Sequence, residues 1–318
     1  MDTQIMVSVI CTVYNHEKYL ADALDGFVSQ KTTFPFEVII HDDASTDSSA
    51  DIIRKYEEKY PEIIKPIYQT ENQHSQGIRI AKTFIIPRIR GKYVATCEGD
   101  DYWTDPLKLQ KQYDFMESHP EYSLCACSAV WLNMSTGKEE NLCRTDVDKD
   151  VPLKDIIDQK LNKTYQYATN FMRAQVYCQR PAWMSSFRVG DLPMAMHAAT
   201  CGKIRMLADP MAVYRFRTSG SWSSRAQDPS YRIAARQSII DGLTAFNAAT
   251  DYQYDEIVVS RIKVQKYNIA RLNRDWKMLR SAELREVWNS RAWHTKLSDF
   301  LACKAPGLQS MLLRKLKK

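Results

Sequence analysis

The first hundred residues alternate between short apolar runs and longer segments with one apolar face. Residues 7–13 (VSVICTV) are apolar and β-branched, which is typical of a strand buried on both faces. From Tyr19 to Val28 the apolar positions recur with the period of a helix. The same alternation predicts strands at 36–41, 64–68 and 93–97 and helices at 47–60 and around 78–86. Strands that alternate with helices predict parallel strands joined by right-handed crossovers, and therefore an α/β fold.

The pattern is less regular after residue 106. It predicts a helix at 107–118, a strand at 123–132, a loop at 133–150, short strands at 167–171 and 204–207, and a helix at 192–201. From Tyr231 the chain is predicted to be helical almost to its end, with breaks near Asp251 and at Pro306-Gly307.

Composition adds a cellular setting to this fold. The chain has 318 residues, of which 44% are hydrophobic and 26% charged, enough for a sizeable core. No sequence run approaches the roughly 18 apolar residues of a membrane span, and residues 1–15 lack a signal-peptide pattern. Eight scattered cysteines form no CxxC or Cys/His zinc spacing. We therefore expect a cytoplasmic enzyme with reduced thiols.

Acidic residues follow two of the predicted strands, where α/β sheets bind ligands. Glu98, Asp100 and Asp101 come directly after the strand at 93–97. Like charges this close resist simultaneous ionisation unless a cation lies between them, so the cluster predicts a site for Mn²⁺ or Mg²⁺. The alternative is a solvated acidic turn.

Asp42 and Asp43 follow the predicted strand at 36–41 and are expected to accept hydrogen bonds from a ribose or a base. Ser45 or Thr46 is the expected cap of the following helix. Tyr14, just past the first strand, is either a base-stacking residue or a surface aromatic.

Three segments in this order and spacing resemble the inverting family-2 glycosyltransferases of the GT-A fold: VSVICTVYNHEKYLADAL, VIIHDDASTDSS and YVATCEGDDYWTDPLKLQKQ. The resemblance covers roughly residues 5–225. It implies a Rossmann-like, mostly parallel sheet flanked by helices, with a nucleotide-binding half at 1–105 and an acceptor-binding half at 106–225. Residues 226–318 are then a helical C-terminal extension.

The resemblance also assigns roles to single residues. Glu98-Gly99-Asp100 matches the family's Asp-x-Asp motif, so that Asp100 is the direct metal ligand, Glu98 a second carboxylate and Asp101 their support. Five further residues are implied to lie at the nucleotide or close to it: Thr12, Tyr14, Asn15, Asp42 and Asp43. Arg79 falls where the family often carries a nucleotide contact.

For the transfer step, the resemblance implies Asp191 as the base that deprotonates the acceptor hydroxyl. Its alternative role is a helix N-cap. Arg217 stands where the family has a histidine, and Arg215 or Arg217 is expected to neutralise the departing diphosphate. Trp222 is expected either near the sugar or in the core.

The resemblance implies a metal-dependent inverting glycosyltransferase that uses a nucleotide-diphosphate sugar. Uracil is the family's commonest base, so the expected donor is a UDP-sugar. The favoured acceptor is a lipid-linked glycan of bacterial surface polysaccharide. The basic, apolar tail after Pro306 is either a solvated face or a peripheral contact with anionic membrane at the inner face of the cell membrane. No nucleic-acid motif is present. The alternative function is a non-catalytic nucleotide-sugar binding module.

Overall fold

The computed structural model describes residues 4–140, 146–158, 166–218 and 221–305. Its central strand is β1 (Val7–Val13), in which every residue but Thr12 is buried. β1 pairs in parallel with β2 (Phe36–Asp42) and with β4 (Tyr93–Thr96), and β2 pairs in parallel with β3 (Ile64–Tyr68). The predicted parallel half of the sheet is confirmed, because fully buried strands leave an uninterrupted apolar run in the sequence.

The other half of the sheet is mixed. β9 (Phe171–Arg173) runs antiparallel to β4 and to β6 (Tyr122–Asn133), and β6 is parallel to β10 (Lys203–Phe216). β5 (Tyr102–Trp103), β7 (Lys138–Glu140) and β8 (Lys149–Asp150) add short antiparallel pairings. Across the described strands the order is β3-β2-β1-β4-β9-β6-β10-β5. Together with the parallel half this gives the predicted GT-A type of α/β fold.

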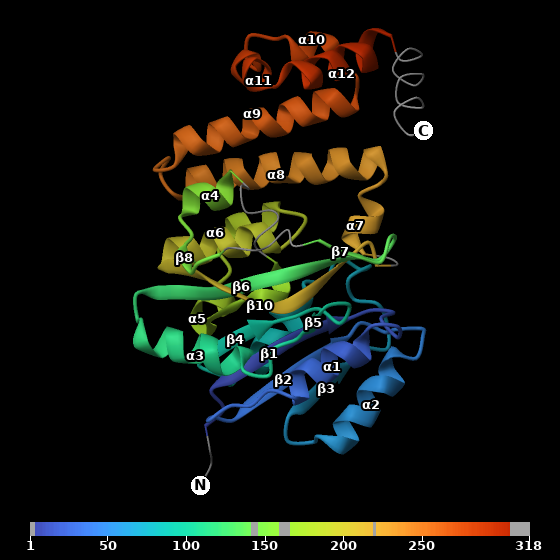
Figure 1. Cartoon of the computed structure of the whole chain (residues 1–318), viewed down its shortest axis with the longest axis vertical. Helices are drawn as coiled ribbons and strands as arrows, with labels where there is room; N and C mark the ends of the chain where they lie inside the picture. The colour runs from blue at the N-terminus through green and yellow to red at the C-terminus, as the bar shows by residue number, and fades with distance from the viewer. Residues whose placement is uncertain (1–3, 141–145, 159–165, 219–220, 306–318) are drawn as a thin grey trace. The chain divides into compact units, whose positions relative to one another are not determined.

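Helices cover the sheet and bury their apolar faces against it. α1 (Leu20–Val28) and α2 (Ser49–Lys59) lie beside strands β1–β3 (Figure 1), and Phe27 of α1 meets Trp103 edge to face at 4.9 Å. The remaining helices of this part are α3 (Lys108–Ser118), α4 (Leu153–Ile157), α5 (Ala174–Cys178), α6 (Asp191–Cys201) and α7 (Trp222–Arg225). Short helical turns lie at Ala81–Ile85, Ile86–Arg88, Tyr167–Thr169 and Ala182–Ser186.

The chain divides into two compact units. One comprises Met1–Arg180 with Met194–Ser224, and the other comprises Pro181–Pro193 with Arg225–Lys318. The segment Pro181–Pro193 therefore groups with the C-terminal helices, although it lies within the predicted domain at 1–225.

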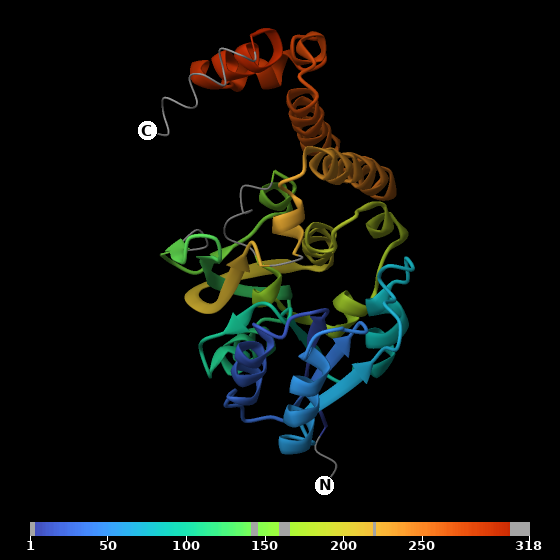
Figure 2. The same ribbon diagram turned by 90° about the vertical axis from the view of Figure 1, so that its right-hand side faces the viewer.

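The second unit is helical and has its own core. It contains α8 (Pro229–Ala249), α9 (Asp255–Leu272), α10 (Trp276–Leu279), α11 (Arg285–Ser290) and α12 (Trp293–Lys304). α8 and α9 lie side by side in both views (Figure 1 and Figure 2). Tyr267, Leu279 and Trp288 are central to the core that α9, α10 and α11 share. No helix among the described residues is long and apolar enough to cross a membrane.

Several predicted elements differ from the structure. The helix expected around 78–86 is a single π-helical turn followed by a 3-10 turn, because Pro87 lacks an amide hydrogen. The strand expected at 167–171 is a 3-10 turn, and the strand begins only at Phe171. The loop expected at 133–150 contains β7 and β8. The short strand expected at 204–207 is the 14-residue β10, whose register shifts at Pro210 hide its alternating pattern.

Candidate active site

The acidic turn follows β4 and lies beside the carboxyl end of the central strand β1. Beyond β4 the chain still pairs with β1, since the amides of Cys97 and Gly99 donate to the carbonyls of Ile10 and Thr12, each at 3.1 Å. Gly99 leaves no room for a side chain: a Cβ there would lie 2.9 Å from His16 Nδ1 and from Val13 Cγ2. The two backbone hydrogen bonds to β1 fix the position of the acidic turn, and the side chains of His16 and Val13 favour glycine at position 99.

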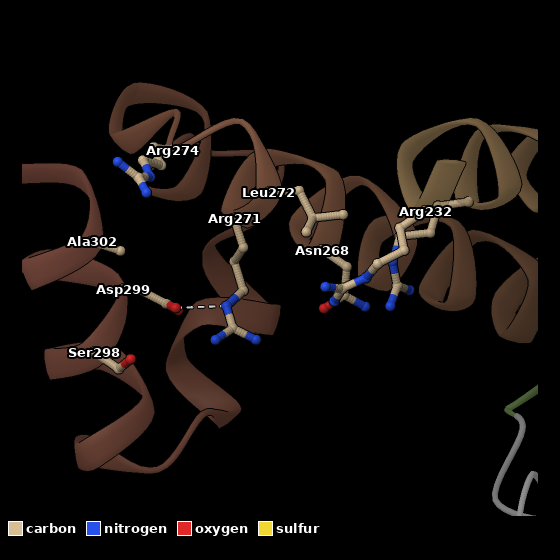
Figure 3. Close-up of a pocket in the computed structure, with 9 residues that line it drawn as sticks. Arg232, Asn268, Arg271, Leu272, Arg274, Ser298, Asp299 and Ala302 are labelled. Atoms are coloured by element: carbon tan, nitrogen blue, oxygen red, sulfur yellow. Dashed lines mark hydrogen bonds and ion pairs between the residues drawn. The ribbon is translucent and has the colours of Figure 1, made fainter. Parts of the chain in front are cut away.

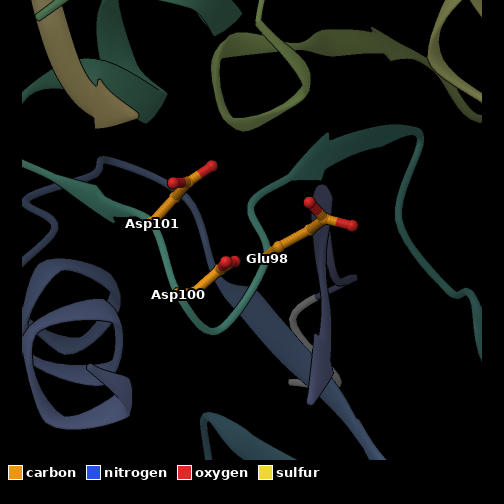
Figure 4. Close-up of side chains that lie close together, drawn as sticks. All are labelled: Glu98, Asp100 and Asp101. Atoms are coloured by element: carbon orange, nitrogen blue, oxygen red, sulfur yellow. The ribbon is translucent and has the colours of Figure 1, made fainter. Parts of the chain in front are cut away.

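The three predicted carboxylates come together at this turn. Glu98, Asp100 and Asp101 each place a carboxylate oxygen within 4.8 Å of the others (Figure 4). Asp101 is only 2% exposed. Burial, and secondarily the charge of Asp100, raises the pKa of the Asp101 carboxyl well above its ordinary value. The cluster is thus an electrostatically costly arrangement that a cation would relieve.

Arg215, at the end of β10, braces this turn. Its amide donates to Asp101 Oδ1 at 2.8 Å and its guanidinium donates to the carbonyl of Asp100 at 3.1 Å. The guanidinium also pairs with Asp22 of α1 and lies 4.4 Å from the ring centre of Tyr102. The Arg215 guanidinium is therefore bound to protein groups on the inner side of the turn, and Arg215 is 6% exposed.

The cluster suits a divalent cation that prefers oxygen. The Thr218 hydroxyl donates to Asp100 Oδ2 at 2.7 Å, while Arg215 occupies Asp101 Oδ1. Each contact fixes the orientation of one carboxylate and leaves its second oxygen without a hydrogen bond among the described residues. Carboxylate oxygens held in this way are the ligands that Mg²⁺ and Mn²⁺ prefer.

Asp42, at the end of β2, offers a buried acceptor. It is 2% exposed, and its Oδ2 accepts from the amide of Ser45 at 3.3 Å. Its Oδ1 is buried and has no hydrogen-bond partner among the described residues. A buried acceptor without a donor is costly, so Asp42 Oδ1 is suited to accept from a ligand N–H or O–H.

The loops that follow β1 and β2 are joined by reciprocal hydrogen bonds. The amide of Asn15 donates to Ser45 Oγ at 2.9 Å, and the amide of Thr46 donates to Asn15 Oδ1 at 2.8 Å. The amide of Glu17 donates to Asp47 Oδ2 at 3.0 Å. Ser45 and Thr46 thus hold the loop after β1 and do not cap α2, contrary to the prediction. Tyr14, next to this junction, is 46% exposed and its ring is accessible for stacking, and Thr12 is half-buried.

Asp43 holds the loop that follows β3. Its two carboxylate oxygens accept from the amides of Gln73 at 2.8 Å and His74 at 3.0 Å, and the residue is 3% exposed. Arg79 follows the same loop and is exposed. The placement gives Asp43 an organising role beside any ligand contact.

The residues expected at the transfer step lie later in the chain. Asp191 is the first residue of α6 and is exposed, although enough protein surrounds it to raise the pKa of its carboxyl to about 6 by desolvation. Arg217 follows β10, is exposed, and has a left-handed backbone with φ of 68°. Trp222 begins α7, but its side chain lies outside the described residues, as does the tail after residue 305.

Two residues that hold the acidic turn from outside it, Asp22 and Thr218, were not predicted from the sequence. Asp22 lies on the polar face of α1, and Thr218 directly follows Arg217 but had no predicted role of its own. Arg215 and Asp22 are 193 positions apart, so no local spacing signals their contact. His16 was missed as well, and its ring lies against the position of Gly99.

Comparison with known proteins agrees with this geometry. Residues 8–188 match the sequence profile of Glycosyl transferase family 2. The chain belongs to this family. In the family-2 domain the acidic turn, Asp42 and Tyr14 all fall within the matched residues.

Two relatives and one solved structure illustrate the similarity. An uncharacterized protein of Mycobacterium bovis is 35% identical over 222 residues, which cover 70% of this chain and 62% of the relative. The Escherichia coli protein WfaP, named UDP-Glc:alpha-D-GlcNAc-diphosphoundecaprenol beta-1,3-glucosyltransferase, is 33% identical over 113 residues, 36% of this chain and 42% of WfaP. The crystal structure of S. aureus TarS 1-349 in complex with UDP-GlcNAc superposes with a TM-score of 0.60 at 20% identity, over 94% of this chain and 81% of TarS. The TarS likeness shows a shared fold.

Proposed function

We propose that this protein transfers one sugar from a nucleotide-diphosphate donor, a UDP-sugar, to a hydroxyl group of a lipid-linked glycan, with inversion at the anomeric carbon. Membership of family 2 supports a glycosyl transfer. The complex of TarS with UDP-GlcNAc and the name of WfaP support the donor and acceptor classes.

The observation that carries the donor site is the buried, unpartnered Oδ1 of Asp42. It ends the strand next to β1, so it lies at the same sheet edge as Tyr14 and the acidic turn. The ring N–H of uracil can donate a hydrogen bond to this oxygen. Tyr14 offers an exposed aromatic face for stacking. We propose supporting contacts to the nucleotide from four further residues: Thr12, Asn15, Asp43 and Arg79.

Glu98, Asp100 and Asp101 would hold Mn²⁺ or Mg²⁺, with Asp100 as the direct ligand. Such a cation, when bound, neutralises charge that develops on the diphosphate as it leaves. Arg217 directly follows β10. Its guanidinium can bind a diphosphate through two parallel N–H donors. Arg215 is proposed to position the acidic turn and not to contact the diphosphate, because its guanidinium already binds Asp22 and the Asp100 carbonyl.

Asp191 is the proposed base. With a pKa of about 6 it is ionised at neutral pH, so its carboxylate can take the proton of the acceptor hydroxyl. The acceptor oxygen then forms a bond to the anomeric carbon while the bond to the nucleotide diphosphate breaks. Trp222 is proposed to pack against the sugar.

Peripheral membrane contact would bring the enzyme to a lipid-linked acceptor. On α12 the exposed side chains Trp293, Leu297 and Phe300 recur at i, i+4 and i+7 and so share one helix face. The sequence after this helix ends in Leu-Leu-Arg-Lys-Leu-Lys-Lys. Apolar and cationic residues in this combination are typical of helices that lie in an anionic membrane surface.

The donor site is tested by thermal unfolding of the whole chain with UDP, GDP, dTDP and CDP, each with and without Mn²⁺. A ligand that binds only the folded state raises Tm. We expect UDP to raise Tm only when Mn²⁺ is present. Asp100→Ala and Asp42→Ala should each abolish this rise. No rise with any nucleotide would contradict the proposal. Asp191→Asn should keep the rise and lose turnover, whereas unaffected turnover would contradict its role as base.

A further inference from the structure

The second unit contains a cavity of about 280 Å³ between α8, α9 and α12. Four arginines line it, two from α8 and two from α9 or its C-terminal end: Arg232, Arg236, Arg271 and Arg274 (Figure 3). The rest of the lining includes Asn268 and Ser298, which add hydrogen-bonding groups. None of these residues belongs to the part of the chain that matches the family profile.

The single carboxylate in this lining is already bound. Asp299 is 3% exposed, and it accepts from the Tyr267 hydroxyl at 2.6 Å and from Arg271 Nε at 2.5 Å. Arg236 donates to the neutral amide oxygen of Gln265 at 2.9 Å. Within the described residues, Arg232, Arg236 and Arg274 have no carboxylate partner. The cavity therefore has a marked excess of positive charge.

The arginines also repel one another. The pKa of the Arg236 guanidinium is lowered by burial and then by the charges of Arg232 and Arg271. Arginine binds phosphoryl oxygens with two parallel N–H donors, so several guanidinium groups around one cavity can together enclose a multiply charged anion. A bound anion would relieve this repulsion and accept hydrogen bonds from the guanidinium groups.

We propose that this arginine pocket, formed by Arg232, Arg236, Arg271 and Arg274, is a binding site for a phosphoryl or diphosphoryl group. It lies in the helical unit and is separate in sequence from the proposed donor site. The group that fills it is a soluble phosphate ester or diphosphate, or the phosphate of a lipid headgroup. All of these present tetrahedral phosphorus with negatively charged oxygens.

The test measures binding of inorganic pyrophosphate to the full chain by calorimetry in the presence of EDTA, which excludes metal-dependent binding at the donor site. The variants are Arg232→Gln, Arg236→Gln and both together, and Arg285→Gln is the matched control. Arg285 is an exposed arginine of α11 outside the pocket. We expect each pocket substitution to weaken pyrophosphate about tenfold and the pair about a hundredfold, the size of one charge-assisted contact per arginine.

Equal affinity in the double variant and the wild type would overturn the proposal, as would an equal loss in Arg285→Gln. Arg232 is exposed, so its substitution is expected to preserve folding even if Arg236→Gln does not, and far-ultraviolet circular dichroism checks both. Sedimentation with phosphatidylcholine vesicles, with or without phosphatidic acid, distinguishes the source: binding that depends on phosphatidic acid and on Arg232 assigns the pocket to a lipid headgroup.

The donor site and the arginine pocket fail separately. Asp100→Ala should abolish the metal-dependent effect of UDP and leave pyrophosphate binding in EDTA unchanged. Arg232→Gln should weaken pyrophosphate binding in EDTA and leave the metal-dependent effect of UDP unchanged.

Discussion

Replacing Arg215 by Met separates the bracing role of this residue from direct contact with the donor. Met keeps most of the apolar stem and removes the guanidinium. The amide bond from residue 215 to Asp101 Oδ1 survives, because it comes from the backbone. The substitution therefore tests the side-chain contacts to Asp22, to the Asp100 carbonyl and to Tyr102.

The magnitude follows from these three contacts. A charge-assisted hydrogen bond to the Asp100 carbonyl is worth about 1.5 kcal/mol. The Asp22 side chain is 56% exposed, so its pairing adds at most about 1 kcal/mol. The ring contact at 4.4 Å adds about 0.5–1 kcal/mol. We expect Arg215→Met to lower the free energy of unfolding by about 3 kcal/mol, which lowers Tm by about 6–12 °C.

The assay is calorimetric unfolding together with Mn²⁺-dependent binding of UDP, and Arg217→Met is the matched control. Arg217 is exposed, so its substitution should change the free energy of unfolding by less than about 0.5 kcal/mol. The same substitution should weaken binding of the UDP diphosphate. If Arg215→Met instead leaves Tm unchanged and abolishes UDP binding, its guanidinium contacts the donor directly and the bracing role is wrong.

Three further predictions concern single residues. If Asp191 with its pKa of about 6 is the base, kcat/KM rises with pH to a plateau above about 6 and falls about tenfold per pH unit below it. Asp191→Asn should remove this dependence on pH. A wild-type profile that is flat from pH 5 to 7 would contradict the assignment. Gly99→Ala places a Cβ 2.9 Å from His16 Nδ1 and Val13 Cγ2, so we expect a loss of about 1–3 kcal/mol in stability with weaker Mn²⁺ binding, measured by denaturation and metal titration, whereas Gly137→Ala at an open loop position should leave metal binding unchanged. Gly242→Ala places a Cβ 2.3 Å from the ring of Phe187, so this ring must move, and urea denaturation should show destabilisation of about 1–3 kcal/mol with UDP binding retained.

The parallel half of the fold could be predicted nearly residue by residue. β1 and β3 have the predicted bounds, and β2 and β4 end one residue from them, because strands buried on both faces are continuous apolar runs. The strand β10 was underestimated since Asp209-Pro210 interrupts its pattern in the middle. The proximity of Glu98, Asp100 and Asp101 was predictable from sequence, since they occupy one turn.

Contacts between distant segments were not predictable from single-sequence spacing. The unpartnered state of Asp42 Oδ1 depends on what surrounds it in space, and the joining of the Asn15 and Thr46 loops depends on the β1–β2 register. Likewise, the sequence did not indicate that the Asp43 carboxylate holds two amides of a loop about 30 residues later.

Left-handed backbone occurs at the ends of three strands of the sheet, and outside glycine also at Asp251, Tyr252 and Arg274 of the helical unit. Asn15, Ala44 and Arg217 follow β1, β2 and β10 and have φ values of 57°, 59° and 68°, each a left-handed conformation that costs about 1 kcal/mol for a residue other than glycine. Such strain persists only where surrounding contacts enforce it, and here the Asn15–Thr46 and Ser45 hydrogen bonds do so for the first two.

At the third position the enforcing contacts are those of the acidic turn itself, through Arg215 and Thr218 on either side of Arg217. The orientation of Asp100 and Asp101 is thus set by residues more than 110 positions later in the chain. A fragment that ends after residue 105 would contain all three carboxylates and still lack the groups that orient two of them. The geometry of the acidic turn therefore depends on the whole mixed sheet, even though its three carboxylates lie within the first 105 residues.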